Sequence, residues 1–209
     1  MREITRRTNI FEYTDKAVKL CLVRILRRFR KLRRTITAFD DTNVLKEVDS
    51  CYADVLEYTL TYLRLIAKYS YSLVDPEGDF LEEFWLANYL RDYNPVTKYS
   101  FYDEEDRKRA RLIEALFASK TTKGGNPGKE IDRALNLWVR QFEQYADNVT
   151  VDAINQAYED NGVRQVMWVT QKDEKVCSEC RELDGKIFPI DDKPSLQHYN
   201  CRCHYIPVG

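Results

Sequence analysis

Glycine and proline are scarce in this sequence, and long apolar runs are absent. Of 209 residues only 7 are glycine and 6 are proline, which favours long uninterrupted helices over a turn-rich β fold. No apolar run is long enough to predict a transmembrane helix, and the N-terminal residues lack the apolar core of a signal peptide. We therefore expect a protein made in the cytosol, where clustered cysteines bind metal more often than they form disulfides.

Charge is distributed unevenly, although the net charge is only −1. Residues 1–35 contain twelve Lys or Arg and three Asp or Glu, a net charge of +9, which leaves −10 for the rest of the chain. The hydrophobic content of 44% is sufficient for a folded core. A basic segment of this kind points to a polyanion or to an acidic partner.

Apolar residues recur every three or four positions through most of the first 120 residues, which predicts amphipathic helices. The expected helices cover residues 14–38, residues 44–74, residues 80 to just before Pro95, and residues 103–119. Asp41 or Thr42 is expected to cap the second of these helices. The first 119 residues are therefore predicted to be a region of long helices.

One face of the first expected helix is strongly basic and lies opposite an apolar stripe. The basic residues are Arg24, Arg27, Arg28, Arg30, Lys31, Arg33 and Arg34, with Arg33 nearer the edge of the stripe. Three interpretations are open for this face. It is a solvated helix surface, or it contacts nucleic-acid phosphates without reading sequence, or it docks on an acidic face of a protein partner.

Residues 120–129 contain three glycines and an Asn-Pro pair, which predicts a linker. We therefore divide the chain into a helical region at 1–119, the linker at 120–129 and a C-terminal module at 130–209. A helix at about residues 130–145 and a further short helix ending at Gly162, a favourable C-cap residue, are expected to open this module.

Beyond Gly162 the pattern changes to short β-rich segments. Residues 164–171, 185–190 and 203–208 are expected strands, and Asp184-Gly185 is a tight-turn signal. The predicted fold class is thus a mainly α N-terminal region of long helices with a small C-terminal α+β module. A module this small buries little core, and a staple from its Cys/His cluster would stabilise it.

Four of the six cysteines and both histidines lie between Cys177 and His204. The CxxC pair, Cys177 and Cys180, supplies two thiols on one turn, and a second group follows 17 residues later. Structural zinc takes four sulfur or nitrogen ligands, commonly two from each of two short loops. The candidate metal ligands are Cys177, Cys180, His198, Cys201 and Cys203, and His204 is the weakest further candidate. Lys175, Arg181, Lys186 and Arg202 lie nearby and are candidates to balance the thiolate charge.

Other interpretations of the cluster stay open. Cys177 and Cys180 can form a disulfide, the cysteines can be unmetallated packing residues, or the CxxC can be a redox pair, although no βαβ pattern surrounds it. A catalytic zinc needs an open coordination position and a base in a substrate pocket, and nothing else in the sequence indicates such a pocket. Cys21 and Cys51 lie in helical segments and are expected to be ordinary core residues.

The C-terminal segment resembles the signature of the phage Mu F-like family of minor head proteins, also called phage head morphogenesis proteins. The matching positions are Trp168, Asp173, Cys177, Cys180, Leu183, Asp184, Gly185, Lys186, His198, Asn200, Cys201, Arg202, Cys203 and Pro207. The resemblance covers about residues 130–209. The preceding helix lacks the Arg-Thr-Glu start of the family, and Gln197 stands where Pro-rich sequence is usual.

The resemblance implies a bacteriophage minor capsid protein that is made in the host cytoplasm and resides in the virion, inside the head near the portal vertex. Its implied partners are the portal and the capsid or scaffold proteins, with non-specific contact to packaged DNA as a further expectation and no membrane. The family is not enzymatic, so the hypothesised zinc is structural and serves viral assembly. The alternative is a cellular zinc-ribbon protein that binds nucleic acid through the basic helix. A zinc deaminase is disfavoured because its His-x-Glu and Pro-Cys-x-x-Cys pattern is missing.

Overall fold

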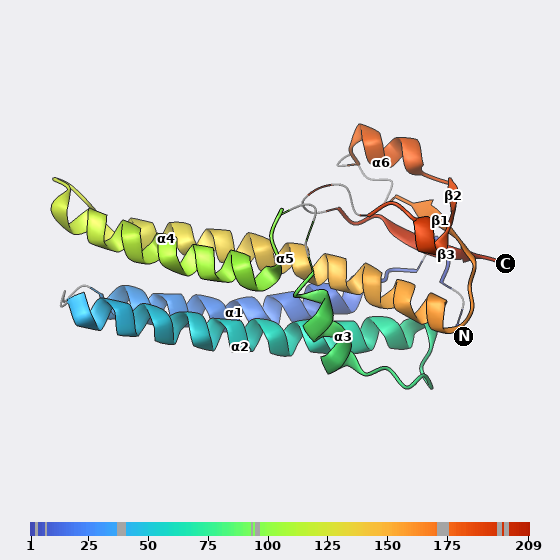
Figure 1. The fold of residues 1–209 in the computed structure, drawn as a ribbon, viewed down its shortest axis with the longest axis horizontal. Coiled ribbons are helices and arrows are strands. Elements are labelled where there is room, and N and C mark those ends of the chain that lie inside the picture. Colours follow the sequence, from blue (N-terminus) through green and yellow to red (C-terminus); the bar gives the residue numbers. More distant parts are fainter. Residues whose placement is uncertain are drawn as a thin grey trace. The chain divides into compact units, whose positions relative to one another are not determined.

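A computed structural model describes the chain except for residues 3, 7, 37–40, 93, 95–96, 171–175, 196–197 and 199–200. The elements in chain order are α1 (Glu12–Thr35), α2 (Asp41–Val74), α3 (Glu82–Tyr89), α4 (Phe101–Thr121), α5 (Pro127–Asp160), β1 (Gln165–Val169), α6 (Ser178–Leu183), β2 (Ile187–Pro189), a 3-10 turn (Ile190–Asp192) and β3 (His204–Val208). The predicted fold class, long helices followed by a small α+β part, is confirmed (Figure 1).

Several sequence-based expectations fall outside the described residues. The expected cap at Asp41 or Thr42 concerns side chains that are not described, and the stop at Pro95 is also outside. The same holds for Asp173 and Lys175, and for Gln197 and Asn200 in the second half of the signature. Among the described residues, no helix combines the length and apolar character that crossing a bilayer requires.

The two helices expected after the linker are one continuous helix, α5, so that prediction was wrong. Polar side chains near its middle bond along the helix instead of breaking it: Gln144 Nε2 donates to Asn148 Oδ1 at 2.6 Å, and Thr150 Oγ1 donates to the Ala146 carbonyl at 2.8 Å. All four of these residues are buried. Because the segment is buried, the free energy of its continued backbone hydrogen bonds outweighs the low helix propensity of Asn and Thr.

The end of α5 is the predicted one. Gly162 has φ +74, its N–H donates to the Glu159 carbonyl at 3.0 Å, and the Val163 N–H donates to the Tyr158 carbonyl at 3.0 Å. These two bonds form a Schellman motif, in which the residue with positive φ is favourably glycine. The chain leaves the helix here and enters β1.

By Cα packing the chain forms two compact units. Unit 1 comprises Met1–Ala17, Leu63–Leu86 and Glu143–Gly209, and unit 2 comprises Val18–Tyr62 and Ala87–Phe142. These boundaries fall inside helices and differ from the division at 1–119, 120–129 and 130–209. Whether those three parts behave as separate domains stays a prediction.

Unit 2 is built from portions of α1, α2, α4 and α5 that run side by side (Figure 1). The apolar stripe of α1 is buried, with Ile25, Phe29 and Leu32 at most 1% exposed. Within this core the Trp138 Nε1 donates to Thr59 Oγ1 at 3.2 Å, which joins α5 to α2. The three-to-four-residue spacing therefore predicted the correct buried face.

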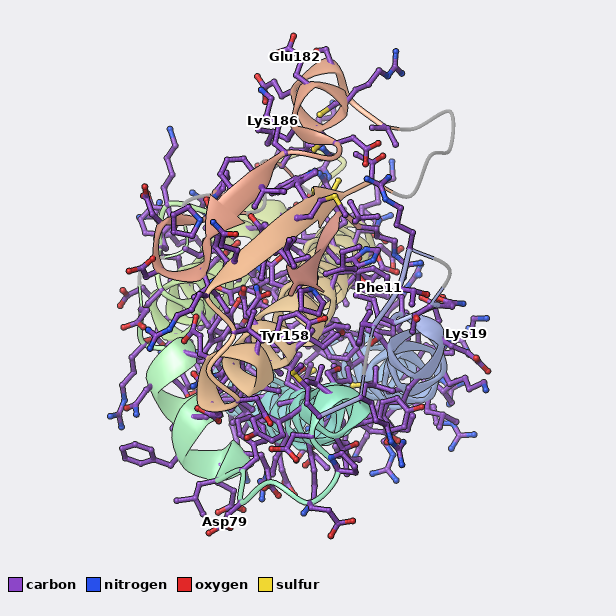
Figure 2. The ribbon with its side chains drawn as sticks, turned by 90° about the vertical axis from the view of Figure 1, so that its right-hand side faces the viewer. Phe11, Lys19, Asp79, Tyr158, Glu182 and Lys186 are labelled. Atoms are coloured by element: carbon purple, nitrogen blue, oxygen red, sulfur yellow. The ribbon has the colours of Figure 1, made fainter. Side chains whose placement is uncertain are left out.

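Unit 1 contains a three-stranded antiparallel sheet in the order β2-β1-β3. Figure 2 shows this sheet beside the end of α5, where Tyr158 is labelled. Trp168 of β1 meets Tyr205 of β3 edge to face at 5.2 Å between ring centroids, and both are buried. The same core includes Ile4, Ile10 and Phe11 from the other end of the chain. The N-terminal residues are thus part of the core that holds the C-terminal sheet.

Candidate metal centre

The CxxC pair opens the short helix α6. Cys177 is the N-cap of this helix, and its sulfur accepts a hydrogen bond from the Cys180 N–H at 3.3 Å. This backbone hydrogen bond lowers the pKa of Cys177, because it favours the thiolate over the thiol. Helix capping therefore positions the CxxC pair.

A type II turn follows α6 and fixes it to the sheet. The Lys186 N–H donates to the Leu183 carbonyl at 2.9 Å, with Asp184 at φ −55, ψ 122 and Gly185 at φ +83. The Gly185 N–H in turn donates to the Trp168 carbonyl at 2.8 Å. Asp184 also accepts a hydrogen bond from the Thr170 N–H at 3.0 Å. The Leu-Asp-Gly-Lys sequence thus docks the CxxC helix on β1.

Five of the six candidate ligands gather around the sulfur of Cys180. They form two overlapping groups, Cys177–Cys180–His198 and Cys180–Cys201–Cys203, and within each group all ligand atoms lie within 4.8 Å of one another. The Cys180 sulfur lies 3.4 Å from His198 Nε2 and 3.7 Å from the Cys201 sulfur. None of these cysteines is in a disulfide.

The two separations at Cys180 fit neighbouring ligands of a tetrahedral zinc. With Zn–S bonds of about 2.3 Å and Zn–N bonds of about 2.0–2.1 Å, tetrahedral ligands are about 3.8 Å apart for two sulfurs and about 3.6 Å for sulfur and nitrogen. The distances at Cys180, to Cys201 and to His198, are close to both values. They are far longer than the S–S bond of about 2.05 Å in a disulfide. The cluster is therefore able to hold a metal ion.

The cluster is unfavourable as a set of bare thiolates. Burial, together with the neighbouring thiols of Cys177 and Cys201, raises the pKa of Cys180 to about 12. Cys203 has its pKa raised by the hydrogen bond with Cys201 and by burial. Without a cation these buried groups stay protonated at neutral pH, whereas a bound divalent metal favours the thiolates. The thiolate ligands therefore need a compensating charge.

His204 belongs to neither group among the described residues. It begins β3, is 2% exposed, and neither ring nitrogen has a hydrogen-bond partner within the described part of the chain. Burial lowers the pKa of His204 to about 4, so the ring is neutral. Its position as the weakest ligand candidate agrees with this geometry.

Arg202 was expected to balance thiolate charge, but its guanidinium is hydrogen-bonded to two carboxylates. It donates to Asp15 in the first turn of α1 and to Asp147 of α5, at 3.3 Å from Asp147 Oδ1. The guanidinium also lies over the ring of Phe11, 4.8 Å from the centroid. Cys201 and Cys203 flank this residue. Their thiols lie in the cluster, whereas the guanidinium between them contacts α1 and α5. No sequence pattern indicated this pairing, because Asp15 and Asp147 are far away along the chain.

The basic residues of α1 differ in what they contact. Arg28 is buried and donates to Asp54 and, at 2.7 Å, to Ser50. Arg33 pairs with Asp132 of α5 at 2.9 Å. These two residues join helices of unit 2 to each other, so they do not present a free charge.

The other basic side chains of the predicted basic face are exposed; they are Arg24, Arg27, Arg30, Lys31 and Arg34. Arg24 lies over the rings of Tyr58 and Tyr62, with centroid distances of 5.6 and 5.8 Å. Arg24, Arg27 and Lys31 are among the residues that line a surface hollow of about 390 Å³. The structure thus leaves a smaller basic surface than the seven-residue face expected from the sequence.

Comparison with known proteins gives a family for the part of the chain that contains the cluster. Residues 106–206 match the family model described as Phage Mu protein F like protein. The comparison with curated proteins gave no match, and neither did the comparison with solved structures. The matched range includes α6, the type II turn and all five clustered ligand candidates.

Proposed function

We propose, on the premise that residues 106–206 match the model of the Phage Mu F-like family, that the protein is a minor head protein of a bacteriophage. Its place would be the interior of the head at the portal vertex, with the portal and the capsid or scaffold proteins as partners. The observation that carries this proposal is the Cys/His cluster inside the matched range, held by the capped helix α6 and the Asp184-Gly185 turn. The role is structural, and no catalytic step is assigned.

The metal in this proposal is zinc. Thiolate and imidazole ligands together suit zinc better than calcium or magnesium, which prefer oxygen. Cys177, Cys180 and His198 supply three ligands. The fourth comes from Cys201 or Cys203, which form the second group around Cys180. When bound, zinc would compensate the buried thiolates and stabilise unit 1.

Contact with packaged DNA is part of the proposal, through phosphates alone. The exposed basic side chains and the hollow lined by Arg24, Arg27 and Lys31 support it. Such contacts give affinity without base recognition and fall steeply with salt. The same surface favours the second candidate function, a cellular zinc-ribbon protein whose main partner is nucleic acid.

Head assembly distinguishes these functions. We would express the chain together with the portal and capsid proteins encoded beside it and purify the assembled heads. The proposal predicts that the chain is retained in heads and that portal rings bind it in the absence of DNA. A chain absent from heads that still binds DNA with a steep salt dependence would support the second function and refute the first.

The metal is tested separately by its content per chain after purification without chelator. About one zinc per chain is expected, lost in Cys180→Ala and retained in the control variant Cys51→Ala, whose thiol is buried away from the cluster in unit 2. Comparing Cys201→Ala with Cys203→Ala identifies the fourth ligand. Equal zinc content in Cys180→Ala and Cys51→Ala would overturn the assignment.

A further inference from the structure

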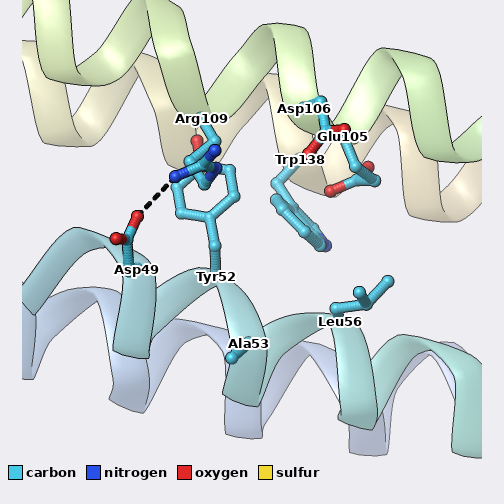
Figure 3. A pocket seen from close by; sticks show the side chains of 8 residues that line it. All are labelled: Asp49, Tyr52, Ala53, Leu56, Glu105, Asp106, Arg109 and Trp138. Carbon is cyan, nitrogen blue, oxygen red and sulfur yellow. Dashed lines mark hydrogen bonds and ion pairs between the residues drawn. The ribbon is translucent and has the colours of Figure 1, made fainter. Parts of the chain in front are cut away.

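Unit 2 contains a cavity that none of the preceding functions uses. It has a volume of about 260 Å³ and lies between α2 and α4, with the indole of Trp138 from α5 as part of its lining (Figure 3). A single water needs only about 10–15 Å³ by this kind of measure. The cavity therefore has room for a small ligand or for an inserted side chain.

Aromatic and apolar groups form much of its wall. The rings of Tyr52 and Trp138 meet at 80°, 5.0 Å between centroids, and Ala53 and Leu56 of α2 also line the space. Figure 3 shows Tyr52 rising from α2 next to Trp138. Aromatic faces carry partial negative charge and attract cations, while methylene groups pack well against all four side chains.

The charged lining residues have an acidic excess. Arg109 is the cation among them, and its Nη1 is paired with Asp49 Oδ1 at 2.6 Å (Figure 3). Two further lining carboxylates, those of Glu105 and Asp106, are left without that partner. An anionic ligand such as a phosphate would be repelled here, whereas a cation would be attracted.

Glu105 is the group that makes this cavity unusual. It is 6% exposed, and neither of its carboxylate oxygens has a hydrogen-bond partner among the described residues. The ammonium of Lys108 lies 3.8 Å away and is shared with Glu104, at 3.6 Å. Within the described part of the chain, the Tyr52 hydroxyl is also buried without a hydrogen-bond partner. A buried carboxylate and hydroxyl in this state carry a desolvation cost that a ligand with N–H donors would offset.

We propose that this cavity binds an alkylammonium group. The ammonium would provide compact donors to Glu105 and to the Tyr52 hydroxyl, and its methylene chain would pack on Trp138 and Leu56. An ammonium suits the space better than a guanidinium because it is smaller and its donors are not held in one plane. The group is supplied either by a free polyamine or by a lysine side chain of another protein. The inference does not depend on the proposed role in head assembly.

Calorimetric titration of the full chain with n-butylammonium tests the proposal, at pH 9 because burial raises the pKa of Glu105 to about 8 and the carboxylate must be ionised. Saturable binding in the millimolar range is expected, weakened about tenfold or more in Glu105→Gln, which keeps the shape and removes the charge. The matched control is Glu114→Gln, an exposed glutamate on the same helix, which should bind like the wild type. Tyr52→Phe removes only the hydroxyl and should weaken binding severalfold, so the test survives if Glu105→Gln fails to fold.

The source of the ammonium is distinguished by two further ligands. Spermidine binding much more tightly than butylammonium, with a capped lysine peptide weaker than both, would identify a free polyamine. A capped lysine peptide that binds as well as butylammonium would identify a protein side chain. No saturable binding, or equal affinity in wild type, Glu105→Gln and Tyr52→Phe, would overturn the proposal.

Discussion

Replacing Arg202 by methionine would test how unit 1 is held together. Arg202 is the partner of Asp147, whose side chain is only 9% exposed, and also of the more exposed Asp15. Removing one partner of a buried ion pair typically costs about 3–5 kcal/mol, because the other charge is left buried and unpaired. The pair with Asp15 adds little, since exposed pairs are worth about 0–1 kcal/mol. With its 39% exposed side chain discounted, Arg202→Met should lower the free energy of unfolding by about 2–4 kcal/mol at neutral pH.

The destabilisation by Arg202→Met should depend on pH, because Asp147 titrates. Burial raises the pKa of Asp147 to about 6, even though Arg202 acts to lower it. Because this value is above the unfolded one, ionisation of Asp147 costs stability as pH rises from about 4 through 6, and the protonated form carries no such cost. Without Arg202 the pKa of Asp147 rises further. The destabilisation by Arg202→Met should therefore be large at pH 8 and small near pH 4.

Chemical unfolding at these two pH values is the measurement, on the wild type, Arg202→Met, Asp147→Asn and the double variant. The double-mutant cycle should give a coupling energy of at least about 1 kcal/mol at pH 8. Zinc content is measured in parallel, so that loss of a neighbouring ligand is not mistaken for loss of the ion pair. Equal destabilisation at both pH values, or a coupling energy near zero, would refute the reasoning.

Three further predictions concern other sites. Chelation of the metal should make the segment from Val176 to Gly209 sensitive to protease while most helical circular dichroism is kept; unchanged resistance would contradict a stabilising zinc. Burial raises the pKa of Glu105 to about 8. The wild type should therefore lose stability relative to Glu105→Gln as pH rises from 5 to 9, by up to ~4 kcal/mol. A difference in unfolding free energy that does not change with pH would count against this. A Cβ on Gly125 would lie 1.9 Å from the Ser119 carbonyl oxygen, whereas one on Gly124 would meet no atom of the described residues within 4 Å. Gly125→Ala should therefore destabilise unit 2 in thermal unfolding by more than Gly124→Ala, which costs only about 1–2 kcal/mol for its positive φ. The reverse order would exclude the clash.

Local patterns in the sequence were sufficient for most of the elements. The spacing of Ile25, Phe29 and Leu32 predicted the buried face of α1, because helix periodicity depends only on neighbours within a few turns. Gly162 predicted the end of α5 for the same reason, since a Schellman motif involves six consecutive residues. The spacing from Cys177 to Cys203 predicted a cluster, because ligands on two short turns meet once those turns are adjacent.

What the sequence alone could not determine depends on residues distant along the chain. The middle of α5 stays helical because its polar side chains are buried and bonded along the helix. Arg202 faces Asp15 and Asp147 instead of the thiolates, and Ile4 and Phe11 complete the core around the C-terminal sheet. The acidic cavity at Glu105 arises where α2, α4 and α5 meet. Each of these features depends on which groups the tertiary packing buries and brings together. Desolvation and charge interactions act on that assembled environment and not on the local sequence.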